Sequence, residues 1–136
     1  LFRSADYWGH WLKIGSFTSP DKLPRIYQVN WFRKNKDGKF IWPGFGDNSR
    51  VLDWIVRRLE GEAEAVDTPV GRLPAEGELN VDGLDVPAAQ LEELFAVDPV
   101  TWAAEADLTE EYYGKFGDRV PAKLREQLDA LRVRLS

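Results

Sequence analysis

The 136-residue sequence predicts an α+β chain, in which one short β element is combined with several helices. Residues 25–32 are rich in β-branched and aromatic side chains, which favour a strand. Residues 49–60 carry apolar side chains at helical spacing and precede a glycine, a common helix stop. Residues 85–136 show helical spacing in three further segments. A chain of this length can bury a real core, so we expect one domain.

The first expected element is a helix over residues 7–14, which Asp6 can cap and Gly15 can end. The aromatic side chains of this helix are interpreted as packing residues: Tyr7, Trp8 and Trp11. His10 is the only histidine, and the sequence offers it no obvious carboxylate or nucleophile as a partner. We therefore interpret it as a buried or rim residue rather than a catalytic one.

The expected β element follows a loop rich in Gly, Ser, Thr and Pro. Residues 25–32 form its first strand, and residues 36–39 form a turn. Within that turn Asp37-Gly38 can adopt positive φ angles. Residues 40–42 return as a short second strand, which the breaker Pro43-Gly44 ends.

The next expected element is a helix from about Ser49 to Glu60, before Gly61. Asp47, Asn48 or Ser49 can cap its start. Its predicted buried face contains Val51, Leu52, Ile55, Val56 and Leu59. The glycine-rich stretch before it therefore lies at a helix N-terminus, where backbone amides and the helix dipole present positive charge.

The remainder of the chain changes character twice. Residues 62–84 are rich in Pro, Gly and Asp, and we expect short extended pieces around residues 68–73 and 79–81. Residues 85–136 are expected to form a helical tail of three helices. Prolines near the start of each expected helix fit the first turn, at Pro87, Pro99 and Pro121.

Composition removes several classes of function. The chain has no cysteine, which excludes disulfides and thiolate chemistry, and its single histidine leaves no local histidine cluster for a metal. No apolar run approaches the length of a membrane span, and no signal peptide is visible. We therefore expect a cytoplasmic protein that does not bind a membrane. The net charge of −5 argues against a nucleic-acid partner.

The charge is unevenly distributed. Residues 21–50 contain seven basic and three acidic side chains, so this segment is +4 and the remainder is −9. Lysines of this kind commonly guard a solvated hairpin edge. They can equally create a positive field beside a ligand that carries phosphate.

The most informative stretch is residues 31–50, which hold five aromatic side chains, three glycines and one proline. Phe32, Phe40 and Phe45 can stack on a planar ring, and the amide of Asn48 can read the edge of a purine. A packed aromatic cluster followed by a helix cap explains the same residues. Neither a complete dinucleotide fingerprint nor the Gly-Lys-Ser/Thr of a P-loop occurs in this stretch.

The run Phe-Ile-Trp-Pro-Gly-Phe-Gly-Asp-Asn-Ser-Arg-Val-Leu, residues 40–52, closely resembles the guanine-binding segment of GTP-dependent phosphoenolpyruvate carboxykinase. Flanking residues agree, among them Asp6-Tyr7, Leu23-Pro24 and Thr68-Pro69-Val70-Gly71. The resemblance covers nearly the whole chain but only about the C-terminal quarter of that enzyme. The opening residues 1–5 depart from the family pattern.

The resemblance implies that residues 1–136 are a single C-terminal segment of a larger enzyme, within the α/β C-terminal domain of the carboxykinase fold. Residues 25–60 would be the guanine-binding strand, loop and helix, followed by the helical tail over residues 85–136. The implied guanine pocket consists of Phe32, Phe40, Phe45, Gly46, Asp47 and Asn48. Asn48 would read the edge of the base.

The family converts oxaloacetate and GTP to phosphoenolpyruvate, CO2 and GDP, with Mn2+ at the active site and Mg2+ on the nucleotide. Its phosphate-binding loop, metal ligands, oxaloacetate-binding arginines and lid lie upstream of the matching segment. The resemblance thus implies a chain without catalytic residues or metal ligands, inactive alone, in a monomeric enzyme. Oxaloacetate and phosphoenolpyruvate would bind through the missing part.

Two other interpretations use the same residues. The chain can be a free-standing purine-nucleotide-binding or regulatory module that does not catalyse a reaction. It can also be a structural piece whose aromatic slot is filled by its own side chains.

Overall fold

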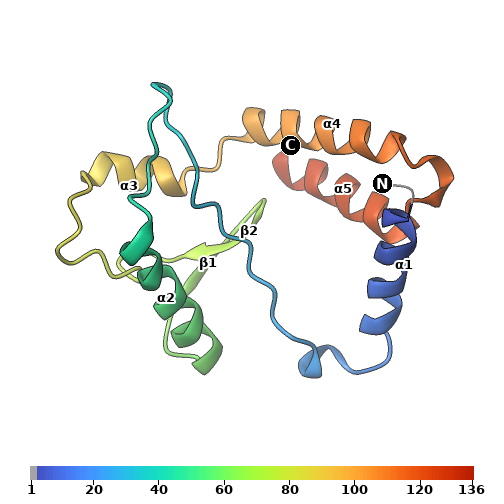
Figure 1. The fold of residues 1–136 in the computed structure, drawn as a ribbon, viewed down its shortest axis with the longest axis horizontal. Helices are drawn as coiled ribbons and strands as arrows, with labels where there is room; N and C mark the ends of the chain where they lie inside the picture. Colours follow the sequence, from blue (N-terminus) through green and yellow to red (C-terminus); the bar gives the residue numbers. More distant parts are fainter. Residues whose placement is uncertain (1–2) are drawn as a thin grey trace. The chain divides into compact units, whose positions relative to one another are not determined.

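The computed structural model describes residues 3–136, which contain five α-helices and one two-stranded antiparallel sheet (Figure 1). The predicted α+β composition is therefore confirmed. The described residues form two compact units, one from residues 27–97 and one that combines residues 3–26 with residues 98–136.

The unit built from the two ends of the chain is helical. It contains α1 (Ser4–Gly15), α4 (Pro99–Gly114) and α5 (Ala122–Leu135), with the short 3₁₀ turns Pro20–Lys22 and Gly117–Arg119. The helix expected over residues 7–14 is thus confirmed and begins earlier, and the predicted tail helices from Pro99 and after Pro121 are present.

The core of this helical unit is small and aromatic. Ala5, Phe116 and Val120 are buried, and Trp8 packs on them with its ring centroid 4.8 Å from that of Phe116. The prediction that all the aromatic residues of α1 pack was wrong. Tyr7 and Trp11 are mostly exposed and contact each other at a centroid distance of 6.3 Å. Of these aromatic side chains only Trp8 packs in this core, where it is partly buried.

Helix α4 has a well-formed N-terminal cap. The Asp98 carboxylate accepts hydrogen bonds from the hydroxyl and the backbone N–H of Thr101. Both bonds lower the pKa of Asp98 below its ordinary value, and the bond from the Thr101 hydroxyl has the larger effect. Because the carboxylate form is favoured in the folded state, this contribution to stability is present above the unfolded pKa. It is lost as the pH falls through the lowered folded pKa.

The second unit contains α2 (Asn48–Glu60), β1 (Ala65–Thr68), β2 (Gly71–Pro74) and α3 (Ala88–Phe95). The strands pair as a hairpin in which Ala65 faces Pro74 and Thr68 faces Gly71. The extended pieces expected around residues 68–73 are present as this hairpin, which spans residues 65–74, whereas the piece expected at residues 79–81 is not a strand.

The core of the second unit lies around two tryptophans. Its buried members are Trp42, Trp54, Ala63 and Leu79. Partly buried apolar side chains surround them from the loop before α2, from α2 itself and from α3, among them Tyr27, Val51, Ile55, Leu94 and Phe95. Trp42 and Trp54 are each 4% exposed. This core holds the segment before α2 against the helix.

The strand predicted over residues 25–32 is not formed among the residues described. This region is irregular, and the nearest pairing is an isolated bridge between Lys34 and Phe40. β-Branched and aromatic residues favour a strand only where a second strand supplies hydrogen-bond partners, and none of the described segments does so here. The expected strand over residues 40–42 is likewise reduced to that bridge.

The turn predicted over residues 36–39 is present. Gly38 has φ +76° and donates its N–H to the Asn35 carbonyl at 3.0 Å. The Asn35 side-chain oxygen accepts the backbone N–H groups of Asp37 and Lys39, each at 3.0 Å. The turn is therefore held by an asparagine as well as by the glycine.

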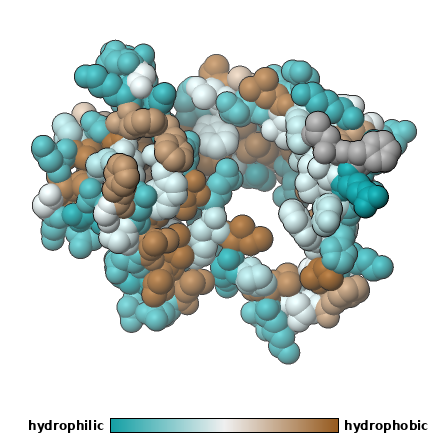
Figure 2. All heavy atoms as spheres, viewed as in Figure 1, coloured by the Kyte–Doolittle hydropathy of each residue, from teal (hydrophilic) through white to brown (hydrophobic). Residues whose placement is uncertain are grey.

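Helix α2 begins at Asn48, one residue before the expected start, and ends at Gly61 with φ +81°. Its predicted buried face was only partly correct. Trp54 is the buried residue of the helix, whereas three apolar side chains of the predicted face are more than half exposed: Leu52, Val56 and Leu59. Figure 2 shows hydrophobic side chains gathered on the surface of the molecule. The helix carries two apolar faces, and periodicity does not say which one is covered.

A long-range contact ties the loop before α2 to α3. Arg33 donates from Nη1 to the Leu94 carbonyl at 2.7 Å and from Nη2 to the Ala96 carbonyl at 3.1 Å. These carbonyls lie at the C-terminus of α3, where a cation also interacts favourably with the helix dipole.

We expect Arg33→Ala to lower the free energy of unfolding by about 1–2 kcal/mol, because both carbonyls lose a charged donor. Denaturant unfolding followed by tryptophan fluorescence measures the change. Lys36→Ala is the matched control, since Lys36 is an exposed cation in the same loop. Equal stability of the two variants would show that the Arg33 contacts do not support the unit.

Candidate functional site

The loop before α2 brings two of the predicted site residues together. The ring centroids of Phe32 and Phe40 are 6.0 Å apart, with the ring planes inclined at 63°. Both rings are mostly exposed, at 73% and 55%. The Lys34 ammonium lies 5.0 Å from the centroid of the Phe40 ring. The pair therefore presents aromatic surface next to a positive charge.

Phe45 stands apart from that pair. Its side chain is 96% exposed, and no ring contact within residues 3–136 joins it to Phe32 or Phe40. Its φ angle is +47°, the only positive value at a non-glycine residue in the described chain. Gly44 before it has φ +81°, so two successive residues have positive φ angles. For a phenylalanine a positive φ costs about 1–2 kcal/mol.

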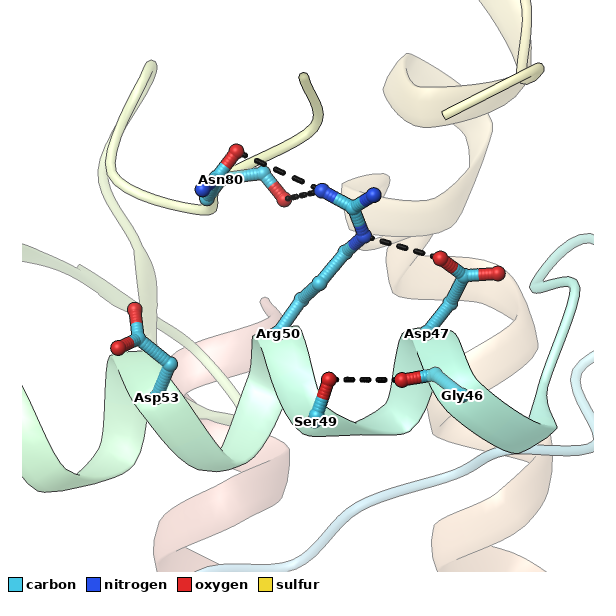
Figure 3. A pocket seen from close by; sticks show the side chains of 6 residues that line it. All are labelled: Gly46, Asp47, Ser49, Arg50, Asp53 and Asn80. Carbon is cyan, nitrogen blue, oxygen red and sulfur yellow. Dashed lines mark hydrogen bonds and ion pairs between the residues drawn. The ribbon is translucent and has the colours of Figure 1, made fainter. Parts of the chain in front are cut away.

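A hollow of about 390 Å³ lies beside the start of α2 (Figure 3). It is lined by Gly46, Asp47, Ser49, Arg50, Asp53 and Asn80. Arg50 reaches from the helix, donating from Nε to the Asp47 carboxylate at 3.0 Å and from Nη1 to the Asn80 carbonyl at 3.1 Å. Ser49 donates its hydroxyl to the Gly46 carbonyl at 2.7 Å.

Asn48 is the first residue of α2 and is half-buried. Its Oδ1 accepts a hydrogen bond from Nε1 of the buried Trp42 at 2.9 Å. The expectation that Asp47, Asn48 or Ser49 caps the helix was wrong, because the N-cap position, Asp47, makes no side-chain cap hydrogen bond. The Asn48 oxygen bonds Trp42, and the Asp47 carboxylate pairs with Arg50 instead.

The structure thus divides the six predicted residues among four places. Phe32 and Phe40 form an exposed pair, Gly46 and Asp47 line the hollow, and Phe45 projects alone. Asn48 is held by Trp42 and is not among the residues that line the hollow.

Four residues that line the hollow were not predicted as site residues: Ser49, Arg50, Asp53 and Asn80. The spacing of Asp47 and Arg50 is an i, i+3 pair, which a helix places side by side, so the ion pair could have been predicted. Asn80 lies 30 positions from Arg50, and no local pattern signals that contact. Trp42 was recognised as an aromatic residue of the stretch, but its hydrogen bond to Asn48 was not predicted.

The described residues do not fit a metal centre. No group of three or more His, Cys, Asp or Glu side chains that could hold a metal ion occurs in residues 3–136. In the same range no helix is both long and apolar enough to cross a membrane.

Comparison with known proteins places the chain in a family. Residues 2–134 match the family model described as the phosphoenolpyruvate carboxykinase C-terminal P-loop domain. The chain belongs to the GTP-dependent phosphoenolpyruvate carboxykinase family. Although the family description names a P-loop, no Gly-Lys-Ser/Thr sequence occurs in the 136 residues.

Individual carboxykinases are similar along the whole chain. The phosphoenolpyruvate carboxykinase [GTP] of Paenarthrobacter aurescens (strain TC1) is 45% identical over 134 residues. Those of Treponema pallidum (strain Nichols) and Neocallimastix frontalis are each 47% identical, over 136 and 135 residues. The matches cover 98% to 99% of this chain but 22% of each carboxykinase. The chain therefore corresponds to part of the C-terminal domain of the family.

Proposed function

We propose that this chain supplies guanine specificity to a GTP-dependent phosphoenolpyruvate carboxykinase of which it is the C-terminal portion. The observation that carries the proposal is the match along nearly the whole chain to proteins named phosphoenolpyruvate carboxykinase [GTP]. The residues assigned to the base are Phe32, Phe40, Phe45, Gly46, Asp47 and Asn48. They lie within the proposed guanine-binding segment of residues 25–60, ahead of the helical tail of residues 85–136.

The exposure of the three phenylalanine rings supports this assignment. A packed aromatic cluster would hide its rings, whereas Phe32, Phe40 and Phe45 are each more than half exposed. Phe45 in addition has a positive φ angle, a strained backbone conformation for a non-glycine residue. Strain at an exposed aromatic residue is typical of sites that await a ligand, and a purine ring is a suitable stacking partner.

The local charge supports a nucleotide. Lys34 lies beside the aromatic pair, and the segment of residues 21–50 carries a charge of +4 within an acidic chain. The N-terminus of α2 adds the partial positive charge of the helix dipole beside the hollow. A base with attached phosphates would meet a positive field.

In the complete protein the proposed reaction is conversion of oxaloacetate and GTP to phosphoenolpyruvate, CO2 and GDP. We assign no catalytic residue and no ligand for Mn2+ or Mg2+ to this chain, because the family resemblance implies that those residues lie upstream of the matching segment. Oxaloacetate and phosphoenolpyruvate are assigned to the rest of the protein. A cytoplasmic monomer is the proposed form of the whole enzyme.

The full-length protein is expected to convert oxaloacetate to phosphoenolpyruvate with Mn2+ and GTP, and with ATP much more slowly. The isolated 136-residue chain should show no turnover, since the chemistry is assigned to residues outside it. A coupled assay with both proteins measures this. Turnover by the pure, mass-verified chain would refute the assignment of the catalytic residues to the rest of the protein. GTP binding by a full-length protein without turnover would favour the regulatory module instead.

A further inference from the structure

We propose that Trp42 is a positioning residue that determines which end of the Asn48 amide faces the base. In this way Trp42 would select guanine over adenine without touching either ring. The proposal rests on the proposed guanine-binding function and deepens it by assigning specificity to a residue outside the set that contacts the base.

The contact between Trp42 and Asn48 allows only one orientation of the Asn48 amide. The indole Nε1–H of Trp42 can only donate, so the group that faces it at 2.9 Å must be the carbonyl oxygen of Asn48 and not its NH2. The amide nitrogen therefore occupies the other end. The carbonyl oxygen still has a second lone pair with which to accept from a ligand.

Trp42 is itself firmly held. It is 4% exposed and packs in the core with Trp54, Ala63 and Leu79. The carbonyl of Ile41, the residue before it, accepts a hydrogen bond from the Gln90 side chain at 2.5 Å. The indole is thus a rigid reference point against which the half-buried Asn48 side chain is oriented.

The orientation matters because guanine and adenine present opposite patterns on the same edge. At ring positions 6 and 1, guanine offers an acceptor (O6) and then a donor (N1–H). Adenine offers a donor (the 6-amino group) and then an acceptor (N1). In one stacked pose, an amide that reads guanine reads adenine after it rotates by half a turn, which exchanges its oxygen and nitrogen.

An asparagine amide is normally free to make this rotation, since its terminal torsion is broad and roughly two-fold. With Trp42 in place the rotated amide would turn its NH2 toward another N–H donor. The rotation would cost the existing hydrogen bond and leave the indole N–H buried without an acceptor. Trp42 therefore penalises the form of Asn48 that accepts adenine.

The second tryptophan of the same core shows that packing alone does not require this hydrogen bond. Trp54 is equally buried at 4% exposure, and within residues 3–136 its Nε1 has no hydrogen-bond partner. Among the described residues, the hydrogen bond to a side-chain acceptor therefore distinguishes Trp42 from Trp54. Trp54 provides a matched control for Trp42, since the same substitution removes the same atoms from the same cluster.

The test compares Trp42→Phe and Trp54→Phe in the full-length protein, by kcat/KM with GTP and with ATP and by thermal unfolding. Trp42→Phe should lower the GTP-over-ATP ratio roughly fivefold or more, mainly through faster use of ATP, because the rotated amide is no longer penalised. Trp54→Phe should leave the ratio within about twofold while lowering the melting temperature comparably. Equal ratios for the two variants would overturn the proposal.

Where Trp42→Phe does not fold, benzothienylalanine at position 42 keeps the shape of the ring and lacks only the N–H. A folded protein with this residue and an unchanged ratio contradicts the proposal. Asn48→Ala distinguishes the proposed base-reading role of Asn48 from the proposed positioning role of Trp42. If it lowers the ratio and the position 42 variants do not, only the role of Trp42 fails. If wild-type protein shows no preference for GTP, the proposed function itself fails.

Discussion

Replacing Asn48 by alanine in the full-length protein is expected to lower the GTP-over-ATP ratio of kcat/KM roughly tenfold or more, since one or two matched hydrogen bonds are lost at about 1–3 kcal/mol each. The loss should fall on GTP, whose edge matches the amide orientation that Trp42 imposes. Stacking on the phenylalanines does not distinguish the bases, so KM for ATP should change little. Steady-state kinetics with both nucleotides gives the ratio.

Asn48→Ser is the control for this prediction. Serine is a good residue at a helix start, but it has no amide with which to read a base. The structure shows no side-chain cap at the N-cap position of α2, so the Ser and Ala variants should lose specificity alike. If Asn48→Ser keeps the full preference for GTP, the assignment of Asn48 as the base reader is wrong.

Phe45→Ala in the full-length protein is expected to weaken GTP binding by about 1–3 kcal/mol, the range for a base stacked on one aromatic side chain. The affinity for oxaloacetate should change much less. Because the Phe45 ring is 96% exposed in this structure, its removal should leave thermal stability nearly unchanged. Isothermal titration with GTP, together with a melting curve, measures both effects.

Phe45→Tyr keeps the aromatic ring and should retain GTP binding close to that of the wild-type protein. Equal losses for GTP and oxaloacetate in Phe45→Ala, accompanied by a lower melting temperature, would indicate that the residue supports folding and does not stack on the base. The strained φ angle of +47° at Phe45 is retained in the tyrosine variant, so the comparison isolates the ring.

Much of the helical structure was predictable because its signals are local. Helix α2 starts within one residue of the predicted position and ends at Gly61, whose left-handed φ a glycine adopts without strain. The turn at Gly38 was predictable for the same reason. The wrong predictions concern partners instead: residues 25–32 have strand-forming side chains but no neighbouring strand among the described residues.

The candidate site shows the same division. The aromatic residues and Asn48 were recognisable from their local sequence, because the glycine-rich run before a helix and its family resemblance span a dozen consecutive positions. Their surroundings were not recognisable. The contacts of Arg50 with Asn80 and of Arg33 with Leu94 join residues 30 and 61 positions apart.

By itself, the sequence determined the family, the approximate extents of the main helices, the turn and the identity of the candidate residues. All of these depend on neighbours within a few turns of the chain or on a contiguous motif. Only the tertiary structure decided which face of α2 is buried, that Phe45 is exposed while Trp42 is not, and that Trp42 donates to Asn48. Burial and side-chain hydrogen bonds depend on which segments contact each other in the folded chain. Backbone preferences and hydrophobic periodicity do not specify those contacts for individual residues.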